Sequence, residues 1–438
     1  MRYYLISLGC AKNTVDAEGM GQLLNDAGYR PVGQPAEADL LIVNTCGFVE
    51  AARVESLGVL RELAEGKRAN QWLVAAGCLS QRYGRALAEQ VTGLDGILGT
   101  RHWMEIVTLA ERLRQGRRGP PYDIPDEGTI APDSPGVARA AVVGRSAYLK
   151  IADGCRRPCA FCAIPLIKGT ARSRPPEAIL AEAGQLVDAG VQEIILIAQD
   201  TTDYGRDLGL CDGLTSLIDG ILGAAPELRW LRIMYAYPGA LTLCLIETMA
   251  RYPQVCHYLD LPLQHGHPDV LRRMRRPASM TRVRRQIEDL RAAMPDIALR
   301  TTFIVGFPGE TEAEFAELEA FVQEIAFDKV GVFTYSHEEG TAAGVLPDDV
   351  PAEVKKERYE RLMALQQGIS LARNQAQVGR CLEVLLEGVG DGVSLGRTYR
   401  DAPEIDGLVI IEEELPTAQI VQARIVGAME YDLVGVLA

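Results

Sequence analysis

Cys155, Cys159 and Cys162 form the most regular group of reactive side chains in the sequence, a C-x3-C-x2-C run. Three closely spaced thiolates on one loop suit three irons of a 4Fe-4S cluster, and the fourth iron then remains free for a substrate or cofactor. The alternative is structural zinc, which usually takes four ligands in paired C-x2-C knuckles. No fourth Cys or His lies near this run in the sequence, so the spacing favours the cluster.

Cys10, Cys46 and Cys78 form a second, dispersed group. Each follows an apolar segment that predicts a β-strand, and consecutive members are 36 and 32 residues apart, about one βα unit. Open α/β sheets bind ligands at the carboxyl edge of their strands, so we predict that these thiols converge on a second cluster. A small residue precedes each cysteine, and we expect it to leave room for the cluster. The alternative, three cysteines that only pack as small hydrophobic side chains, does not explain three equivalent positions.

The elements that must position the dispersed cysteines alternate between strand and helix patterns. Alternation of this kind predicts an open parallel sheet with helices on its faces, which we assign to an N-terminal domain over 1–115. A Pro- and Gly-rich stretch over 116–136 breaks the pattern and predicts a linker over 116–140. The expected strands cover 3–8, 39–44 and 72–76, and the expected helices cover 13–27 and 50–65.

Residues 141–372 again alternate strands and helices and predict a partial (β/α)6 barrel. Chemistry in such barrels takes place at the carboxyl ends of the strands, and the Cys155 run directly follows the first of them. The expected strands cover 147–151, 193–197, 231–234, 258–261, 298–304 and 330–333, with helices such as 176–189 and 310–325 between them.

Residues 373–438 predict a small all-β barrel of roughly OB-like size. Its expected strands cover 382–386, 408–411, 420–425 and 433–437. This segment contains five basic and eleven acidic residues. A module that grips RNA should be basic, so the charge of the barrel predicts a basic protein as partner instead.

Three polar residues near the expected strand ends are candidate ligand contacts. Gln199 and Gln264 each follow a strand at the presumed barrel mouth, and Arg300 begins a strand–turn–helix segment that ends at Glu310. Glycines in that turn allow close approach of the backbone to a ligand. Seven arginines over 271–285 are read either as a solvated helix surface or as a contact for an anionic partner such as rRNA or a carboxylate.

The whole chain has 438 residues, enough for two to four domains, with 47% hydrophobic and 24% charged residues. No apolar run reaches the roughly 20 residues of a membrane helix, and the first residues do not resemble a signal peptide. We therefore expect a cytoplasmic protein without a membrane partner, whose ten cysteines serve metal or redox chemistry rather than disulfides. The net charge of −14 argues against tight, sequence-independent binding to nucleic acid.

Several motifs carry a family resemblance over nearly the whole chain. The Cys155 run, the strand before it and Phe161 resemble the radical S-adenosylmethionine superfamily. Together with the dispersed cysteines and a TRAM-like C-terminal barrel, they resemble the methylthiotransferases, and within these the RimO family. The segments that resemble RimO proteins cover 7–13, 44–48, 198–205 and 396–407. Lys168, where Arg is common, and His337, where Pro is frequent, depart from the family pattern.

The resemblance implies a reaction and its cofactors. RimO proteins add a methylthio group to an aspartate of small-subunit ribosomal protein twelve. It implies two 4Fe-4S clusters, S-adenosylmethionine as methyl donor and radical source, a sulfur donor, and an electron donor such as flavodoxin or ferredoxin. Phe161, Gln199, Gln264 and Arg300 are then the expected contacts to S-adenosylmethionine, and no side-chain acid or base is assigned. Two alternatives remain at this point: a tRNA adenosine as substrate, which the acidic barrel disfavours, and a non-catalytic iron–sulfur protein.

Overall fold

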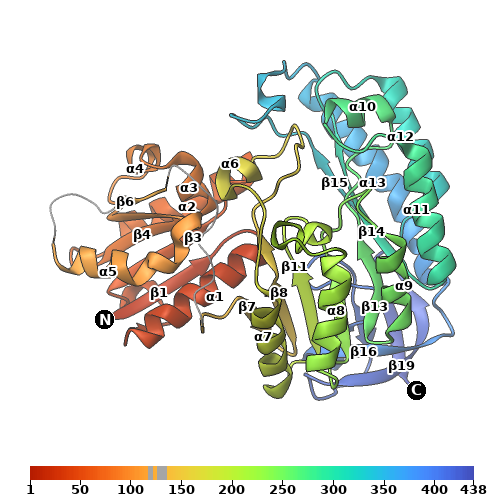
Figure 1. Cartoon of the computed structure of the whole chain (residues 1–438), viewed down its shortest axis with the longest axis horizontal. Helices are drawn as coiled ribbons and strands as arrows, with labels where there is room; N and C mark the ends of the chain where they lie inside the picture. Colours follow the sequence, from red (N-terminus) through yellow and green to blue (C-terminus); the bar gives the residue numbers. More distant parts are fainter. Residues whose placement is uncertain (117–121, 126–135) are drawn as a thin grey trace.

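The computed structural model describes residues 1–116, 122–125 and 136–438, in three parts that follow one another along the chain (Figure 1). The N-terminal part holds a six-stranded sheet, the central part a seven-stranded sheet and a two-stranded ribbon, and the C-terminal part a closed barrel. The three-part α/β architecture predicted from the sequence is therefore confirmed. The predicted linker lies largely outside the described residues, so the domain bounds drawn from it stay predictions.

The N-terminal sheet is parallel throughout, because helices return the chain to the same edge between strands. Its strand order is β2-β1-β3-β4-β5-β6. The three predicted strands are confirmed as β1, β3 and β4. The elements are β1 (Arg2–Ser7), α1 (Ala11–Asp26), β2 (Arg30–Pro31), η1 (Pro35–Glu37), β3 (Leu40–Thr45), α2 (Glu50–Gly66), β4 (Trp72–Gly77), α3 (Cys78–Tyr83), α4 (Ala86–Gln90), β5 (Gly96–Gly99), η2 (Thr100–Glu105), α5 (Ile106–Arg114) and β6 (Tyr122–Asp123).

The central sheet has the order β15-β14-β13-β12-β11-β8-β7, and its six parallel strands confirm the predicted partial barrel. The short strand β7 pairs antiparallel with β8 at the edge. The strands of this part are β7 (Ala140–Val143), β8 (Ser146–Lys150), β9 (Ala152–Asp153), β10 (Arg172–Ser173), β11 (Glu193–Ile197), β12 (Trp230–Ile233), β13 (Val255–Asp260), β14 (Ala298–Val305) and β15 (Lys329–Thr334).

Helices cover the outer face of the central sheet, where a large apolar core joins them to the strands. None of the helices among the described residues is long and apolar enough to cross a membrane. The helices are α6 (Ile164–Lys168), α7 (Pro176–Asp188), η3 (Thr201–Asp203), η4 (Arg206–Leu208), α8 (Gly213–Ala224), α9 (Leu243–Arg251), α10 (Pro268–Arg273), α11 (Met280–Ala293), α12 (Glu312–Ile325), η5 (Ala343–Val345) and α13 (Ala352–Gln375).

The C-terminal barrel closes in the order β16-β17-β18-β20-β19, and all four predicted strands are present. The fifth, β17, was not predicted, because its sequence, Val-Ser-Leu-Gly-Arg, lacks a continuous apolar run. The strands are β16 (Cys381–Gly390), β17 (Val393–Arg397), β18 (Val409–Ile411), β19 (Ile420–Ala428) and β20 (Leu433–Leu437).

The inner face of the central sheet is covered from two directions. Its buried residues, such as Tyr148 and Tyr258, share one apolar cluster with Val15 of α1 and with Leu385 and Ala402 of the C-terminal part. In Figure 1 the violet barrel lies beneath the green strands β13 and β14, and the red helix α1 approaches from the other side. Burial of this face therefore holds the three parts together.

The stretch 396–407, which carries part of the family resemblance, lies between the barrel and the central sheet. Asp401 forms an ion pair with Lys329 of β15 at 2.8 Å, and Asp406 approaches Arg300 of β14 to 3.4 Å. The aspartate side chains are almost fully buried. The sequence analysis counted both as part of an acidic docking surface, but the structure assigns them to the interface between domains.

Candidate active site

One cavity of about 440 Å³ lies between the N-terminal sheet and the carboxyl ends of the central strands. Its volume falls within the range of small-molecule sites, roughly 300–1,000 Å³. All six cysteines singled out from the sequence line it, so two groups that are far apart in the chain meet in one site. We call Cys10, Cys46 and Cys78 the N-terminal triad, and Cys155, Cys159 and Cys162 the central triad.

The N-terminal triad lies at the carboxyl edge of three adjacent parallel strands, as the sequence predicted. Strand β3 pairs with β1 on one side and with β4 on the other. Cys10 caps the N-terminus of α1, Cys46 follows β3 directly, and Cys78 begins α3 after β4. The parallel register therefore brings the three thiols to one edge of the sheet.

Asn13 ties the loops of the N-terminal triad together. Its Nδ2 donates to the carbonyls of Leu8 (2.9 Å) and Thr45 (3.1 Å), and its own carbonyl accepts from Asn44 Nδ2 at 2.7 Å. The Cys78 thiol lies 3.5 Å from Asn13 Oδ1, to which it donates. Satisfied buried networks of this kind rigidify a site. No role was predicted for Asn13 and Asn44, although both lie in the segments 7–13 and 44–48 that carry the family resemblance.

The glycines before Cys10 and Cys78 allow neighbouring segments to pack closely. A Cβ on Gly9 would lie 2.7 Å from Cys46 Cβ, and one on Gly77 would lie 2.6 Å from the Thr45 carbonyl oxygen. Both glycines also adopt positive φ angles, +96° and +97°, which side chains rarely allow. The glycines therefore let neighbouring cysteine loops approach one another, and the expectation that the small residues leave room for a cluster stays a prediction.

The central triad lies on a single loop between β9 and α6. The Cys155 N–H donates to the carbonyl of Gly169 (3.0 Å), which closes the base of the loop. The Ala160 N–H donates to the carbonyl of Met274 (2.9 Å), and the Arg157 N–H points at Cys155 Sγ (3.5 Å). Hydrogen bonds of a single loop, one of them to the distant Met274, therefore shape this triad, in contrast to the strand pairing behind the first.

Burial dominates the chemistry of these thiols. It raises the pKa of Cys78 and of Cys162 to about 12. Burial also acts on Cys10, but Lys12, Lys168 and nearby backbone N–H groups outweigh it and lower the pKa of that thiol. Iron binds thiolates, and its charge replaces the proton. Where burial favours the neutral thiol, as at Cys78 and Cys162, the positive charge of iron would stabilise the thiolate. These buried thiols therefore fit a site that binds metal.

The spacing of the cysteines does not match the zinc alternative. Within the described residues, no three Cys, His, Asp or Glu side chains converge closely enough to hold a single metal ion. One zinc ion binds its thiolates at about 2.3 Å, so ligands of one ion crowd together. A 4Fe-4S cluster attaches its thiolates to separate iron atoms, so it suits a wider spacing.

Three of the four predicted cofactor-binding residues, Phe161, Gln199 and Gln264, line the cavity. Both polar side-chain atoms of Gln199 are buried, and within the described part of the chain neither has a hydrogen-bond partner. An unpaired buried amide costs about 1–3 kcal/mol, so Gln199 fits a site that a polar ligand such as S-adenosylmethionine completes. Gln264 and the neighbouring Tyr235 have φ angles of +78° and +60°, a strain that clusters at functional sites.

Arg300, the fourth predicted residue, does not line the cavity. It is the third residue of β14, and its guanidinium donates to Asp260 at 2.9 Å while it approaches Asp406 of the barrel. Asp260 in turn accepts from the N–H of Tyr235 at 3.3 Å. Arg300 thus lies outside the cavity lining and supports the cavity through Asp260, which binds the backbone of the lining residue Tyr235.

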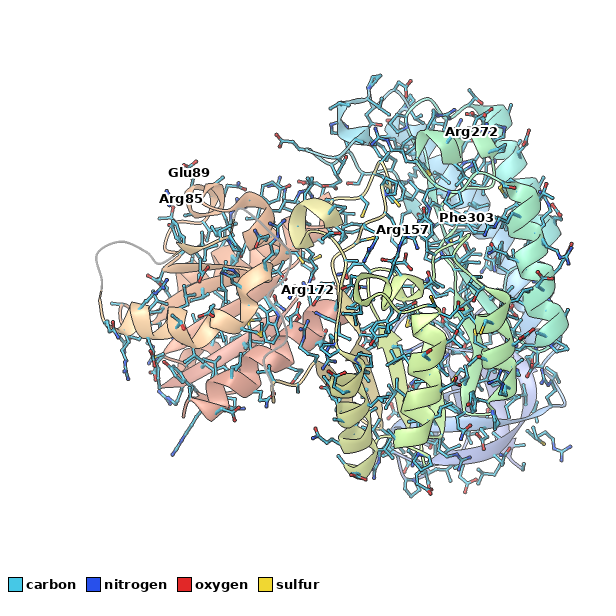
Figure 2. The ribbon with its side chains drawn as sticks, in the orientation of Figure 1. Arg85, Glu89, Arg157, Arg172, Arg272 and Phe303 are labelled. Carbon is cyan, nitrogen blue, oxygen red and sulfur yellow. The ribbon has the colours of Figure 1, made fainter. Side chains whose placement is uncertain are left out.

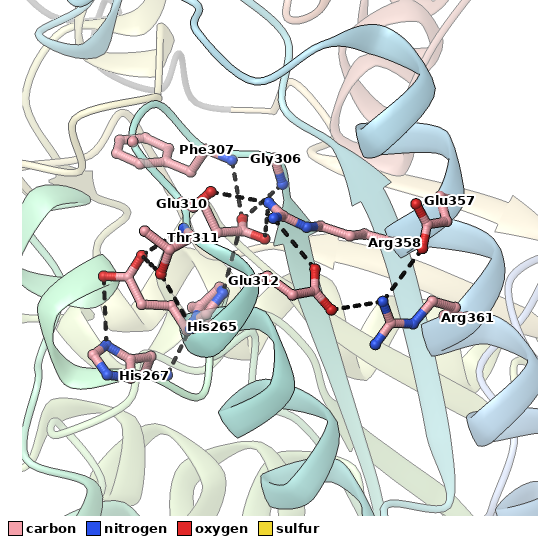
Figure 3. Close-up of polar contacts among 12 residues, drawn as sticks. His265, His267, Gly306, Phe307, Glu310, Thr311, Glu312, Glu357, Arg358 and Arg361 are labelled. Atoms are coloured by element: carbon pink, nitrogen blue, oxygen red, sulfur yellow. Dashed lines mark hydrogen bonds and ion pairs between the residues drawn. The ribbon is translucent and has the colours of Figure 1, made fainter.

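The turn between β14 and α12, for which the sequence predicted a cofactor contact, contributes no residue to the cavity lining and is held from within by Glu310 (Figure 3). This carboxylate accepts from the N–H groups of Gly306 (2.7 Å) and Phe307 (3.1 Å), and Arg358 of α13 donates to it at 3.0 Å. Burial nevertheless raises the pKa of Glu310 to about 7.

A buried charge network joins the N-terminal part to the central sheet behind the cavity. Lys168 donates to Asp16 of α1 (3.0 Å) and to Asp153 (3.1 Å), and Lys150 also pairs with Asp16. Burial opposes ionisation of Asp153, but Lys150, Lys168 and Arg139 hold its pKa well below the usual range. Lys168, which departs from the family pattern, therefore keeps a cationic role in this network.

Two cavity arginines were not assigned by the sequence analysis. Arg157 and Arg276 lie over the ring of Tyr237, with guanidinium carbons 4.1 and 4.4 Å from its centroid. Figure 2 places Arg157 near the middle of the molecule, whereas Arg272 lies at its outer edge. The arginine-rich stretch 271–285 is thus divided: Arg276 reaches the cavity, and Arg272 lies on the surface.

Comparison with known families finds three matching models that follow the three parts of the chain. Residues 2–99 match the Uncharacterized protein family UPF0004, residues 149–322 match the Radical SAM superfamily, and residues 378–437 match the TRAM domain. The Radical SAM match implies a 4Fe-4S cluster and S-adenosylmethionine. It includes the whole central triad and the strands that present it.

Curated relatives match the chain from end to end. One from Roseiflexus sp. (strain RS-1), named ribosomal protein uS12 methylthiotransferase RimO, is 50% identical over 457 residues, which cover 99% of this chain and 97% of that relative. Relatives with the same name from Chloroflexus aurantiacus and Desulforamulus reducens are 50% and 45% identical, and each match covers 99% of both chains.

Solved structures resemble the fold at low sequence identity. The radical S-adenosylmethionine methyltransferase TsrM from Kitasatospora setae, with tryptophan substrate and a S-adenosylmethionine analogue bound, has a TM-score of 0.56 at 15% identity. The match covers 76% of this chain and 72% of that one. The cobalamin-dependent S-adenosylmethionine radical enzyme OxsB has a TM-score of 0.50 at 12% identity, over 84% of this chain and 56% of that one. At these identities the likeness concerns the fold alone.

Proposed function

The chain belongs to the RimO family and is a radical S-adenosylmethionine methylthiotransferase, and from this we propose that it adds a methylthio group to the Cβ of an aspartate in ribosomal protein uS12. The observation that carries the proposal is the cavity in which both cysteine triads meet. A methylthio transfer needs a sulfur site and a radical site within reach of one substrate carbon, and a shared cavity provides that proximity.

The two triads divide the cofactors between them in this proposal. The central triad holds the cluster that the Radical SAM family implies, and the N-terminal triad holds a second 4Fe-4S cluster. When bound, these groups supply the electron for cleavage of S-adenosylmethionine and a site that carries the sulfur to be transferred. S-adenosylmethionine serves as both methyl donor and radical source. The sulfur donor and an electron donor, such as flavodoxin or ferredoxin, come from outside the chain.

The protein contributes binding, orientation and exclusion of water. Phe161, Gln199 and Gln264 contact S-adenosylmethionine in this proposal, because they line the cavity beside the central triad. Arg300 acts as a positioning residue through Asp260 and the backbone of Tyr235. The cavity lies between the N-terminal sheet and the central strands, and this position limits the access of water to reactive groups. We also retain the domain bounds 1–115, 116–140, 141–372 and 373–438, and we expect the enzyme to act in the cytoplasm.

The surface of the C-terminal barrel favours a basic protein over tRNA as the substrate. Although Asp401 and Asp406 are internal, the exposed charged residues of 373–438 are mostly acidic, and Arg424 is the single exposed basic residue among them. A surface of this charge attracts a basic ribosomal protein and repels phosphates. The exposed acidic residues are Glu387, Asp391, Glu404, Glu412, Glu413, Glu414 and Glu430.

Anaerobic incubation of the reconstituted enzyme with S-adenosylmethionine, sulfide, a reductant and either uS12 or tRNA tests the proposal. We expect uS12 to gain the mass of one methylthio group, located at an aspartate by fragmentation, and tRNA to remain unchanged. Methylthio adenosine in the tRNA with unmodified uS12 would instead establish the alternative substrate. Modification of neither, despite two intact clusters, would contradict the proposed function.

A further inference from the structure

Lys12 differs from the other cations of the cavity. Four cationic side chains line the cavity, and three of them already donate to acceptors of the protein. Those three are Arg157 with Asp200, Lys168 with Asp16 and Asp153, and Arg276 with the carbonyl of Pro262. Among the residues that the structure describes, no carboxylate, carbonyl or hydroxyl accepts a hydrogen bond from Lys12, whose ammonium contacts only the Tyr235 ring.

The ring of Tyr235 fixes the position of Lys12 Nζ. The nitrogen lies 3.2 Å from the ring centroid, a cation–π contact between the N-terminal and central parts. Tyr235 holds a positive φ of +60°, and its backbone is anchored at both ends: its N–H donates to Asp260 and its carbonyl accepts from the Thr201 N–H at 3.1 Å. The protein therefore maintains a strained residue under this ammonium group.

The place of Lys12 is unfavourable for a lysine with a purely structural role. It stands in the first turn of α1, where the helix dipole favours anions, and no acidic residue in that turn offsets it. Only 9% of the residue is exposed, and a buried ammonium that lacks a carboxylate partner is costly. Of the described groups, the Cys10 thiol, whose pKa Lys12 lowers, is the acidic group that it influences, and that thiol is a candidate cluster ligand. An anionic ligand group would relieve these costs.

We infer that Lys12 binds the carboxylate of the substrate aspartate and makes the enzyme specific for a negatively charged side chain. The inference rests on the proposed function and names the residue that recognises its substrate. Lys12 lies two residues after Cys10 and faces Tyr235 at the end of β12, so it stands between the two triads. The carboxyl carbon of aspartate is bonded directly to Cβ. A carboxylate held at Lys12 therefore keeps the reacting carbon inside the cavity that both triads line.

Asp200, the acidic residue that lines the cavity, does not compete for Lys12. Its two carboxylate oxygens already accept from Arg157 (2.6 Å) and from the Thr202 hydroxyl (2.5 Å). A second role for Lys12, to balance the negative charge of a cluster on the N-terminal triad, uses the same position. The two roles predict different substrate preferences. A lysine that only balances the charge of a cluster does not distinguish an aspartate substrate from an asparagine substrate.

The test compares aspartate and asparagine at the modified position of uS12, with wild-type enzyme, Lys12→Met and Lys12→Arg. Methionine keeps the length of the side chain without its charge. We expect the wild type to prefer the aspartate substrate by about 100-fold in kcat/KM, because the asparagine substrate leaves the ammonium group unpaired. Lys12→Met should lose most of that preference, and Lys12→Arg should retain at least about tenfold of it. Lys356→Met, an exposed lysine of α13, is the matched control and should behave as the wild type.

Iron content and cleavage of S-adenosylmethionine in the absence of uS12 separate substrate recognition from cluster binding. The aspartate-to-asparagine ratio is taken within each enzyme preparation, so it does not depend on how much iron Lys12→Met retains. Loss of iron from Lys12→Met together with an unchanged ratio would identify Lys12 as a cluster-balancing residue and overturn the inference. An unchanged aspartate-to-asparagine ratio in an active Lys12→Met enzyme would also overturn it. A wild-type enzyme that modifies tRNA and not uS12 would contradict the proposed function itself.

Discussion

The two cysteine triads line the same cavity but are built in opposite ways. The central triad lies within eight consecutive positions of one loop, which hydrogen bonds to the carbonyls of Gly169 and Met274 hold in place. The N-terminal triad gathers residues from three strand ends across 68 positions of sequence, and Asn13 and Asn44 bind its loops together. One triad is therefore a property of a local segment, whereas the other exists only once the sheet has formed.

The buried carboxylates Asp153 and Glu310 differ in how many cations surround them. Asp153 sits among three cations that hold its pKa well below the usual range, and Asp16 joins this network from α1. Glu310, beside the central strands, has one cationic partner, and its pKa rises to about 7. The cations around Asp153 thus favour its charged form, whereas burial favours the neutral form of Glu310 in the turn after β14.

Removal of one cysteine from each triad should give the largest effects and separate their roles. Cys159→Ala should abolish cleavage of S-adenosylmethionine, because the cluster that activates it loses a ligand. Cys10→Ala should keep that cleavage and abolish the methylthio product. Assays for 5′-deoxyadenosine and for modified uS12, together with iron content, distinguish the two variants. Full product from Cys10→Ala would show that the second cluster is dispensable.

Asp16→Asn should destabilise the contact between the N-terminal and central parts. The substitution leaves Lys150 and Lys168 buried with one anionic partner fewer, which costs about 3–5 kcal/mol. Since Asp16 lies on the helix that Cys10 caps, iron should be lost from the N-terminal triad first. Urea unfolding and iron analysis provide the readouts. Asp26→Asn, an exposed aspartate at the end of the same helix, is the control, and equal effects of the two substitutions would refute the argument.

Glycines that precede a cysteine in each triad offer a matched pair. A Cβ on Gly77 would meet the Thr45 carbonyl, one on Gly154 would meet the Thr170 carbonyl, and both residues have positive φ angles. Each substitution by alanine should cost about 2–4 kcal/mol from backbone strain and overpacking. Gly77→Ala should weaken iron binding at the N-terminal triad and spare cleavage of S-adenosylmethionine, and Gly154→Ala should do the reverse.

The control for this pair is Gly58→Ala in helix α2, where a Cβ meets no atom within 4 Å. Alanine is the better helix former, so this variant should be at least as stable as the wild type. If Gly77→Ala and Gly154→Ala lowered iron binding at both triads to the same extent, the independence of the two triads would have to be abandoned.

The smallest expected effect is a pH dependence of stability that originates at Glu310. Its pKa of about 7 in the folded chain lies above the ordinary 4.5, so Glu310 binds its proton more tightly in the folded state than in the unfolded state. The resulting stability is fully present below pH 4.5 and is lost as the pH rises through about 7. Between pH 5 and pH 7 the loss should reach about 2 kcal/mol.

Glu310→Gln removes this titration and provides the comparison. The carboxylate faces Arg358 of α13, and His265 lies 3.9 Å away, with its pKa lowered to about 3 by burial, so it stays neutral over the range tested. The thermal midpoint of the wild type, measured from pH 5 to pH 8, should fall relative to that of Glu310→Gln as the pH rises. Parallel curves would assign the titration to another group.

Much of the fold was predictable from the sequence because periodic patterns mark regular elements. All thirteen predicted strands are present, with ends that differ from the observed bounds by up to three residues within the core and by more where barrel strands extend past their apolar run, as in β16. Among the described residues, seven strands escaped prediction, and they are short or mixed. Strands β2, β6, β9 and β10 have two residues each, β5 and β7 have four, and β17 contains Ser394 and Gly396. Their partners in the sheet, and not their own composition, make them strands.

The sequence by itself determined the chemistry: six cysteines in two groups, a Radical SAM run and the strands that carry it. The tertiary structure alone decided that both groups share a cavity, that Arg300, Asp401 and Asp406 serve the interface between domains, and that the Lys12 ammonium lies over the Tyr235 ring. Spacing along a chain fixes what one loop can hold. Contacts between residues more than a hundred positions apart depend on how the sheets pack. A local sequence pattern therefore does not determine which buried charges form ion pairs.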